Sequence, residues 1–357
     1  MAKVLMKGNE AMALAAIKGG CEAFYGYPIT PQNELPEYLS KHMKENGRVF
    51  VQSESEVAAI NMVYGAAGGG VRVMTSSSSP GIALKQEGIS YLAGAELPAV
   101  IVNVMRGGPG LGGIQPSQAD YKQITRGGGN GDYYLYSLAP ESLQEAVDLI
   151  KESFEIADYF RGPVMIAVDG LIGQMMEPVD FEQPVPKWEL TPKTWAADGN
   201  RKGREKNIIN SLFLDPYKLE EHNHKLQAKY DEMKDKHQRY ELINMEDAEI
   251  VIVAFGSTAR IARSSIEILA EKGVKCGILR PITIYPYPAK AFDELPTSVK
   301  DLLVVEMSMG QMIDDVKIVN EGRLPIHFYG RTGGIVPEAE EIANKVLEIV
   351  GEKNGKN

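Results

Sequence analysis

Short apolar runs alternate with longer amphipathic or alanine-rich stretches through the first 180 residues of the chain. Five of the apolar runs have the length and composition of buried strands: 23–26, 48–52, 71–75, 98–105 and 163–168. The stretches between them show helical spacing, and the first and third end on glycines: 8–18, 32–46, 56–67, 82–93 and 140–158. This alternation predicts a parallel sheet covered by helices on both faces.

The pattern changes after residue 180. Prolines and polar residues interrupt the next segment, and residues 216–240 then form a highly charged stretch with apolar residues at helical spacing. From residue 247 the alternation resumes, with strands expected at 249–255, 274–279 and 301–306, and helices at 259–272 and 337–350. We therefore expect an α/β domain over 1–180, a linker with a charged amphipathic helix over 181–246, and a smaller α/β domain over 247–357.

Composition and charge narrow the possible classes of function. Hydrophobic residues make up 44% of the 357 residues and charged residues 24%, a balance typical of a globular protein. The formal net charge of −10 argues against nucleic acid or an anionic membrane surface as a partner. Because no apolar run approaches the length of a membrane span and the first residues lack a signal-peptide pattern, we expect a cytoplasmic protein.

Cysteine and histidine usage bears on metal chemistry. The chain has two cysteines, Cys21 and Cys276, which cannot supply the four ligands of an iron–sulfur cluster or a structural zinc site. His222, His224 and His237 lie in the charged stretch, but no carboxylate or cysteine pattern completes a site around them. We expect no metal centre built by this chain alone.

Polar segments follow several of the expected strands. Parallel strands bring their carboxyl ends to one edge of the sheet, where ligands bind. Thr30 lies in the proline-flanked turn 27–31, and its hydroxyl could bind a carboxylate or only begin the next helix. Glu54 and Glu56 lie between a strand and a helix, where a carboxylate either stabilises the helix start or takes part in proton transfer.

Two further segments follow strands in the same way. Residues 76–81 carry four serines ahead of a helix, so their hydroxyls and amides could contact a cofactor or only start the helix. Residues 108–113 match the dinucleotide motif G-x-G-x-x-G, but Pro109 lies inside the match and no helix opens directly after it. We interpret this tract as a loop, with Arg106 before it available to hold an acid group.

Together these segments resemble the alpha subunit of thiamine-dependent 2-oxoacid:ferredoxin oxidoreductases. The resemblance rests on residues 27–31, on 52–56 leading into two alanines, and on 105–110. The runs 76–81 and 94–98 particularly resemble the branched-chain type, 2-oxoisovalerate (3-methyl-2-oxobutanoate):ferredoxin oxidoreductase. The resemblance to the family covers about residues 1–180 strongly and about residues 247–350 moderately.

The resemblance implies both a fold and a reaction. The fold is a thiamine-diphosphate-binding α/β domain of the pyrimidine type, followed by a smaller domain like the C-terminal domain of transketolase. The reaction is the coenzyme A-dependent oxidative decarboxylation of a 2-oxoacid to acyl-CoA and CO₂, with electrons passing to ferredoxin. Branched-chain 2-oxoacids are the favoured substrates, although Lys85 or Arg126 could anchor the second carboxylate of 2-oxoglutarate.

The resemblance also assigns roles to residues. In this family a glutamate at a helix start contacts the aminopyrimidine of the cofactor, and a glycine generally follows nine residues later. Gly65 lies nine residues after Glu56 and eleven after Glu54, so Glu56 is the assigned catalytic acid and Glu54 the alternative. By the same resemblance Thr30 and Arg106 hold the substrate carboxylate, and further contacts to the cofactor come from Ile29, Ser78 and Ser79.

Other parts of such an enzyme are missing from this chain. The family anchors the diphosphate through Mg²⁺ with a Gly-Asp-Gly motif, and these 357 residues contain none. The resemblance therefore implies a beta subunit with the diphosphate half and Mg²⁺, and a small ferredoxin-like subunit with iron–sulfur clusters, a gamma subunit being a further candidate. Two alternatives stay open: a self-contained nucleotide-dependent oxidoreductase using residues 108–113, and a non-catalytic scaffold subunit.

Overall fold

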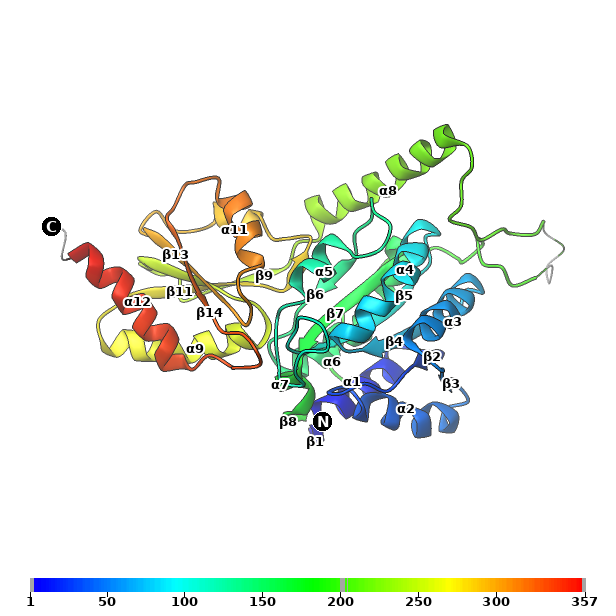
Figure 1. Ribbon diagram of the computed structural model, residues 1–357, viewed down its shortest axis with the longest axis horizontal. Coiled ribbons are helices and arrows are strands. Elements are labelled where there is room, and N and C mark those ends of the chain that lie inside the picture. The colour runs from blue at the N-terminus through cyan, green and yellow to red at the C-terminus, as the bar shows by residue number, and fades with distance from the viewer. Residues whose placement is uncertain (1–2, 200–202, 204, 355–357) are drawn as a thin grey trace.

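The computed structural model describes residues 3–199, 203 and 205–354. Within these residues the strands form three sheets, of seven, five and two strands. Figure 1 shows the larger sheet with its helices in the N-terminal part of the chain and the five-stranded sheet beside it in the C-terminal part. None of the described helices is long and apolar enough to cross a membrane.

The seven-stranded sheet has the order β12-β6-β7-β5-β4-β2-β3. Its strands are β2 (Ala23–Gly26), β3 (Val49–Gln52), β4 (Val73–Ser77), β5 (Ala99–Met105), β6 (Tyr136–Leu138), β7 (Pro163–Asp169) and β12 (Thr283–Tyr285). Neighbouring strands are parallel except for β12, which pairs antiparallel with β6. The parallel sheet expected from the alternating sequence pattern is confirmed.

Helices cover both faces of this sheet, as the alternation predicts (Figure 1). On one face α1 (Gly8–Lys18) packs against α2 (Glu34–Glu45) and α6 (Leu143–Phe160). On the other face α3 (Glu56–Gly68) packs against α4 (Ser79–Gly94). α4 begins three residues before the expected helix, so Ser79 lies in its first turn.

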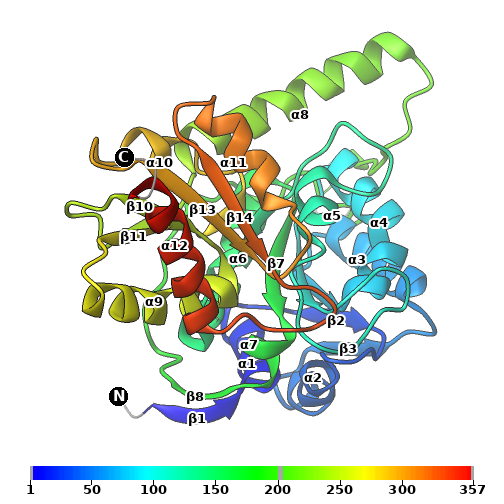
Figure 2. The ribbon, with the colours of Figure 1, turned by 60° about the vertical axis from the view of Figure 1, so that its left-hand side comes forward.

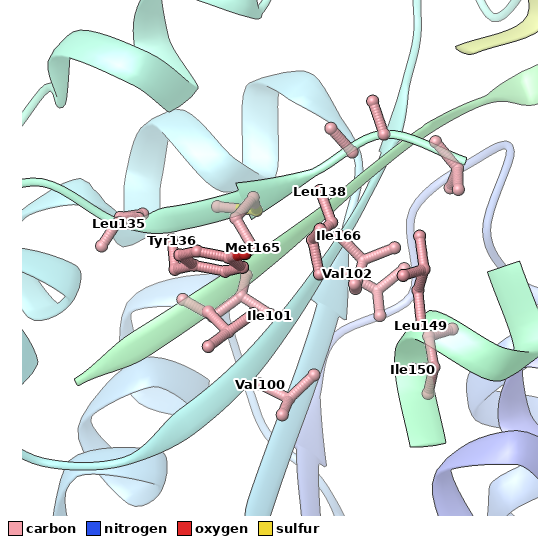
Figure 3. Close-up of a cluster of buried hydrophobic side chains, with 14 of the residues drawn as sticks. Val100, Ile101, Val102, Leu135, Tyr136, Leu138, Leu149, Ile150, Met165 and Ile166 are labelled. Carbon is pink, nitrogen blue, oxygen red and sulfur yellow. The ribbon is translucent and has the colours of Figure 1, made fainter. Parts of the chain in front are cut away.

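The core lies between these helices and the central strands. Figure 3 shows apolar side chains of β5, β6 and β7 meeting those of α6, including Val102, Leu138, Ile166 and Ile150. These four side chains are completely buried. Helices cover β5 and β7 on both sides, so all seven residues of each strand are buried. This is why the sequence shows both strands as continuous apolar runs.

The C-terminal sheet has the order β14-β13-β10-β11-β9. Its strands are β9 (Tyr240–Ile243), β10 (Ile250–Val253), β11 (Cys276–Pro281), β13 (Asp301–Glu306) and β14 (Ile326–Gly330). The helices around it are α9 (Gly256–Glu271), α10 (Lys290–Asp293), α11 (Met312–Asn320) and α12 (Ala339–Asn354). The sequence pattern misses α11 and β14, which are short and only partly buried.

A long charged helix, α8 (Pro216–Lys236), connects the two parts. Leu226, Tyr230 and Met233 form its buried face, as the amphipathic pattern predicts. The N-terminal end of α8 extends away from both sheets in Figures 1 and 2. Tyr217 there is 80% exposed, so the first turns of the helix contribute little to the core.

Smaller elements, which the sequence pattern does not reveal, tie the parts together. β1 (Val4–Lys7) pairs antiparallel with β8 (Met176–Val179). Two short helices also occur: α5 (Tyr121–Arg126) follows the loop after β5, and α7 (Gly170–Gln174) follows β7 directly. β12 comes from the C-terminal part of the sequence but pairs with β6 of the larger sheet. β12 therefore connects the C-terminal part of the chain to the larger sheet.

Candidate active site

Four connections of the larger sheet lie at the carboxyl edge of neighbouring strands. They follow β2, β3, β4 and β5, which are adjacent and parallel. Thr30, Glu56, Ser78 and Arg106 lie in these connections or at the helix starts after them. The topology therefore brings the expected site residues to one edge, as the strand pattern predicts.

Glu56 is the first residue of α3. The hydroxyl of Ser55 caps this helix by accepting a hydrogen bond of 3.1 Å from the amide of Ala58. Glu56 is only 6% exposed, whereas Glu54, two residues earlier, is exposed. The two candidate acids thus differ in environment, because the helix start turns the first into the protein and leaves the second at the surface.

The carboxylate of Glu56 lies against the first turn of α4. A Cβ atom placed on Gly81 would lie 2.8 Å from Oε1 of Glu56 and 2.1 Å from Oγ of Ser77. No side chain larger than hydrogen fits there without moving one of these groups. The glycine therefore lets the helix approach the carboxylate closely.

Lys85 lies one helical turn after Gly81 and is completely buried. Its amine donates a hydrogen bond of 2.9 Å to the hydroxyl of Thr75 on β4. Burial lowers the pKa of Lys85 to about 7, while the negative charge of Glu56 acts on it in the opposite sense. The sequence suggests Lys85 only as a substrate anchor, since a single lysine in an apolar helix face gives no sign of its neighbours.

Arg106 and Thr30 meet at the same edge. One terminal nitrogen of the guanidinium donates to the backbone oxygen of Thr30 at 2.8 Å, and the other donates to that of Leu111 at 3.0 Å. Nε of Arg106 is buried and has no hydrogen-bond partner among the described residues. Thr30 itself is exposed. A guanidinium with an unused donor beside an exposed hydroxyl has the chemistry needed to hold a carboxylate.

Ser77, Ser78 and Ser79, at the end of β4 and the start of α4, lie between Glu56 and Arg106. Ser78 occupies the N-cap position of α4, yet its buried hydroxyl makes no hydrogen bond within the described residues, and the same holds for Ser77. The hydroxyl of Ser79 accepts a bond of 3.0 Å from the amide of Arg106. Ile29 is half-buried in the turn after β2. The first turn of α4 thus contacts both Glu56 and the backbone of Arg106.

Other buried polar groups near this edge are found only in the structure. Asn103 on β5 donates to Asp120 at 2.8 Å, and burial raises the pKa of that aspartate. Gln32 accepts a bond of 2.6 Å from the hydroxyl of Ser76. These pairs join residues far apart in the sequence, so no local motif indicates them.

The remaining sequence candidates have partners inside the chain. Arg126 forms an ion pair with Asp315, which also accepts a hydrogen bond of 2.6 Å from Tyr121. Both cysteines are buried, and burial raises the pKa of each thiol to about 12. Neither thiol therefore ionises readily to bind a metal.

The glycine tract after Arg106 folds back on itself. The amide of Gly113 donates to the oxygen of Gly107 at 2.8 Å, and the amide of Gly107 donates to that of Gln115 at 3.0 Å. The next helix, α5, does not begin until Tyr121. A dinucleotide site needs a helix N-terminus directly after such a tract, so the geometry does not support the nucleotide-dependent alternative.

Comparison with known proteins decides the family. The family described as pyruvate flavodoxin/ferredoxin oxidoreductase, thiamine diphosphate-binding, matches residues 14–253, and pyruvate:ferredoxin oxidoreductase core domain II matches residues 248–342. The chain belongs to the 2-oxoacid:ferredoxin oxidoreductases. This confirms the family that the strand-end motifs indicate and the thiamine-dependent chemistry that it implies.

Individual relatives carry names from the same family. The ketoisovalerate oxidoreductase subunit VorB of Methanothermobacter marburgensis is 49% identical over 99% of this chain and 100% of its own length. The 2-oxoglutarate synthase subunit KorA of Archaeoglobus fulgidus is 37% identical over 97% of this chain and 98% of its own. Both relatives of this 2-oxoacid:ferredoxin oxidoreductase chain therefore match it from end to end.

Solved structures show the same fold. The 2-oxoglutarate:ferredoxin oxidoreductase from Magnetococcus marinus, solved with 2-oxoglutarate, coenzyme A and succinyl-CoA, has a TM-score of 0.88 at 26% identity. The match covers 97% of this chain but only 65% of that longer one. A split-gene transketolase has a TM-score of 0.60 at 14% identity, which is a likeness of fold alone. The thiamine-diphosphate-binding α/β fold is confirmed.

Proposed function

We propose that this chain is the alpha subunit of a branched-chain 2-oxoacid:ferredoxin oxidoreductase and that Glu56 is its cofactor-contacting acid. The observation that carries the assignment is the buried carboxylate of Glu56 at the start of α3, against Gly81. The first turn of α4 contacts this carboxylate and, through Ser79, the backbone of Arg106. Acid and guanidinium are thereby held by one rigid element.

The residues of this edge fit the pyrimidine half of thiamine diphosphate. Ser77 and Ser78 have buried hydroxyls without partners in the described residues, and Glu56 is a buried acid able to hold a proton at a ring nitrogen. When bound, the cofactor supplies the nucleophilic carbon and accepts the electrons of decarboxylation. Ser79 and Ile29 complete the contacts that we assign to the cofactor side.

Arg106 and Thr30 are assigned to the substrate. The guanidinium of Arg106, whose buried Nε has no partner among the described residues, and the exposed residue Thr30 would bind the carboxylate of a 2-oxoacid and orient its keto group toward the cofactor. The hydrogen bonds of the guanidinium to the backbone oxygens of Thr30 and Leu111 fix its plane before substrate arrives.

A branched-chain substrate is supported by two observations. VorB relatives are 49% and 48% identical to this chain, against 37% for the KorA relative of Archaeoglobus fulgidus. Lys85 and Arg126, the two cations considered for a second carboxylate, are engaged with Thr75 and Asp315. 3-Methyl-2-oxobutanoate, which has one carboxylate and an apolar branch, fits such a site better than 2-oxoglutarate does.

Partner subunits would supply the rest of the enzyme. The chain has no Gly-Asp-Gly motif and only two cysteines, both buried. We therefore assign Mg²⁺ and the diphosphate half to a beta subunit, and the iron–sulfur clusters to a small ferredoxin-like subunit, with a gamma subunit as a further candidate. The complex would act in the cytoplasm and pass electrons to ferredoxin, with coenzyme A accepting the acyl group.

The assignment of Glu56 is tested in the reconstituted complex. Glu56→Gln keeps the shape of the side chain but removes the ionisable group, so kcat for 2-oxoacid oxidation should fall at least about 100-fold. Glu54→Gln, at the exposed neighbouring acid, is the matched control and should stay within about twofold of the parent. Activity lost in Glu54→Gln but kept in Glu56→Gln would reverse the assignment.

Substrate choice is tested with a panel of 2-oxoacids and a viologen acceptor. We expect 3-methyl-2-oxobutanoate to give a higher kcat/KM than 2-oxoglutarate or pyruvate, because Lys85 and Arg126, the cations considered for a second carboxylate, are engaged with Thr75 and Asp315. A preference for 2-oxoglutarate would contradict the branched-chain assignment. If the complex oxidises none of the acids, and replacement of Glu56, Thr30 and Arg106 together changes nothing in assembly, a scaffold role is favoured.

A further inference from the structure

A buried amine lies on the same face of α4 as Gly81, which meets the proposed catalytic acid, and the roles assigned above make no use of it. Lys85 is completely buried, and its amine donates a hydrogen bond to the neutral hydroxyl of Thr75. Taking an ammonium group out of water costs several kcal/mol unless an opposite charge compensates it. Among the described residues, Glu56 is the charged group that acts on it.

The geometry of α4 encloses this pair. Gly81 and Lys85 are four residues apart and so lie on one face of the helix, the face that meets Glu56. A turn further, a Cβ on Gly88 would lie 2.5 Å from Cγ2 of Ile60, so α4 stays in close contact with α3 along this face.

The other charges near Lys85 point elsewhere. Glu87, two residues along α4, is exposed and accepts a hydrogen bond from Tyr91. On the side of β4, the amine meets the hydroxyl of Thr75, which carries no charge near neutral pH. Of the elements packed around Lys85, α3 therefore contributes the opposing charge through Glu56.

We propose that Lys85 is a positioning residue for Glu56, whose buried carboxylate it balances from a fixed place on Thr75. The inference rests on the proposed role of Glu56. A buried acid that exchanges a proton with the cofactor would otherwise leave an isolated charge in the interior at one stage. Lys85, held on Thr75 on the helix face that carries Gly81, places its amine where it offsets that charge.

The pairing is tested by titrating Lys85 directly. The full chain, labelled with ¹³C at the lysine Cε positions, is followed by NMR from about pH 5 to 10, and Lys85→Arg or Lys85→Met identifies the signal. Glu56→Gln should lower the titration midpoint of Lys85 by about one pH unit or more, because it removes the opposing charge that α3 supplies. Glu87→Gln, an equal change on the exposed side of α4, should leave the midpoint in place. An unmoved midpoint in Glu56→Gln would overturn the proposal.

A second measurement links the pairing to catalysis. In the reconstituted complex, Lys85→Met should lower kcat about tenfold or more and change its pH profile, while KM for the 2-oxoacid stays the same. The profile of a residue with only a packing role would keep its shape. If Glu56→Gln is inactive but the midpoint of Lys85 does not move, only this inference fails; if Glu56→Gln is fully active, the proposed function fails instead.

Discussion

At the scale of single residues, the site depends on what lies next to a few side chains. Glu56 is buried because Gly81 leaves room for its carboxylate. The guanidinium of Arg106 is fixed because its two terminal nitrogens donate hydrogen bonds to backbone oxygens. The sequence places Glu56 at a helix start but does not reveal what covers it. Two substitutions test how closely these neighbours control the acid.

The first is Gly81→Ala. Alanine normally stabilises a helix relative to glycine by up to about 1 kcal/mol, but here the new Cβ would lie within 3 Å of Ser77 and Glu56. We expect the Glu56 carboxylate to move and kcat of the complex to fall by about 100-fold, with a smaller effect on stability. Steady-state kinetics and urea denaturation separate the two effects. Gly351→Ala in α12, where a Cβ meets open space, should leave kcat unchanged.

The second concerns the pH dependence contributed by Lys85. Its pKa is lowered to about 7 in the folded chain, so between about pH 7 and 10.5 the unfolded chain binds a proton that the folded chain does not. Stability should therefore rise with pH in this window, by at most about 1.4 kcal/mol per pH unit from this group.

Lys85→Met should remove that rise, which urea denaturation at several pH values between about 7 and 9.5 would measure. Lys218→Met on the exposed surface of α8 is the control and should keep the parent slope. Equal slopes in the parent and Lys85→Met would show that Lys85 titrates as an ordinary surface lysine.

At the scale of elements, two helix starts define the site. α3 begins at Glu56 after Ser55, whose hydroxyl caps the helix, and α4 begins at Ser79, two residues after the end of β4. The sequence places both helices within a few residues because glycines and prolines mark their ends. It does not show that the two helices pack against each other, which depends on Gly88 meeting Ile60.

Removal of the α3 cap should loosen the turn that carries Glu56. Ser55→Ala leaves the amide of Ala58 without its side-chain partner, so the unfolding free energy should fall by about 1 kcal/mol. Ser264→Ala, at an exposed position inside α9, should change it by less than about 0.5 kcal/mol. Equal effects of the two substitutions would mean that the cap bond contributes nothing to stability.

At the scale of the whole molecule, the C-terminal part holds the loop that follows Arg106. Gln118 is completely buried between the two parts. Its amide nitrogen donates to the oxygen of Phe255 at 2.8 Å, and its oxygen accepts bonds from Thr258 at 2.7 Å and from the amide of Met307 at 3.0 Å. One side chain therefore fixes the end of the substrate-side loop to the start of α9 and to the residue after β13.

Loss of this contact should destabilise the whole chain. Gln118→Leu leaves the polar groups of Phe255, Thr258 and Met307 that bond to Gln118 without this partner. The unfolding free energy should fall by about 3 kcal/mol. Urea denaturation would measure the change, with Gln227→Leu at an exposed position of α8 as the control. A loss no larger than that of the control would show that the interface does not depend on Gln118.

Much of the larger sheet follows from local pattern. The apolar runs at β5 and β7 and the glycines after α1 and α3 identify these elements because buried strands and helix ends have strong local signals. β6 and β12 lack such a signal: each has three residues, and they pair across 145 positions from Leu138 to Thr283. Pairing of that kind is decided by the packing of distant segments.

The sequence by itself determined that Thr30, Glu56 and Arg106 would meet at one edge of the sheet, because strands that follow one another through helices run parallel and end together. It could not determine which acid would be buried, that Lys85 would be buried on the face of α4 that meets Glu56, or that Arg126 would bind Asp315. Those contacts join separate helices and both halves of the chain. Only the tertiary structure decides them, since a charge acquires its partner and its pKa from whatever the fold packs against it.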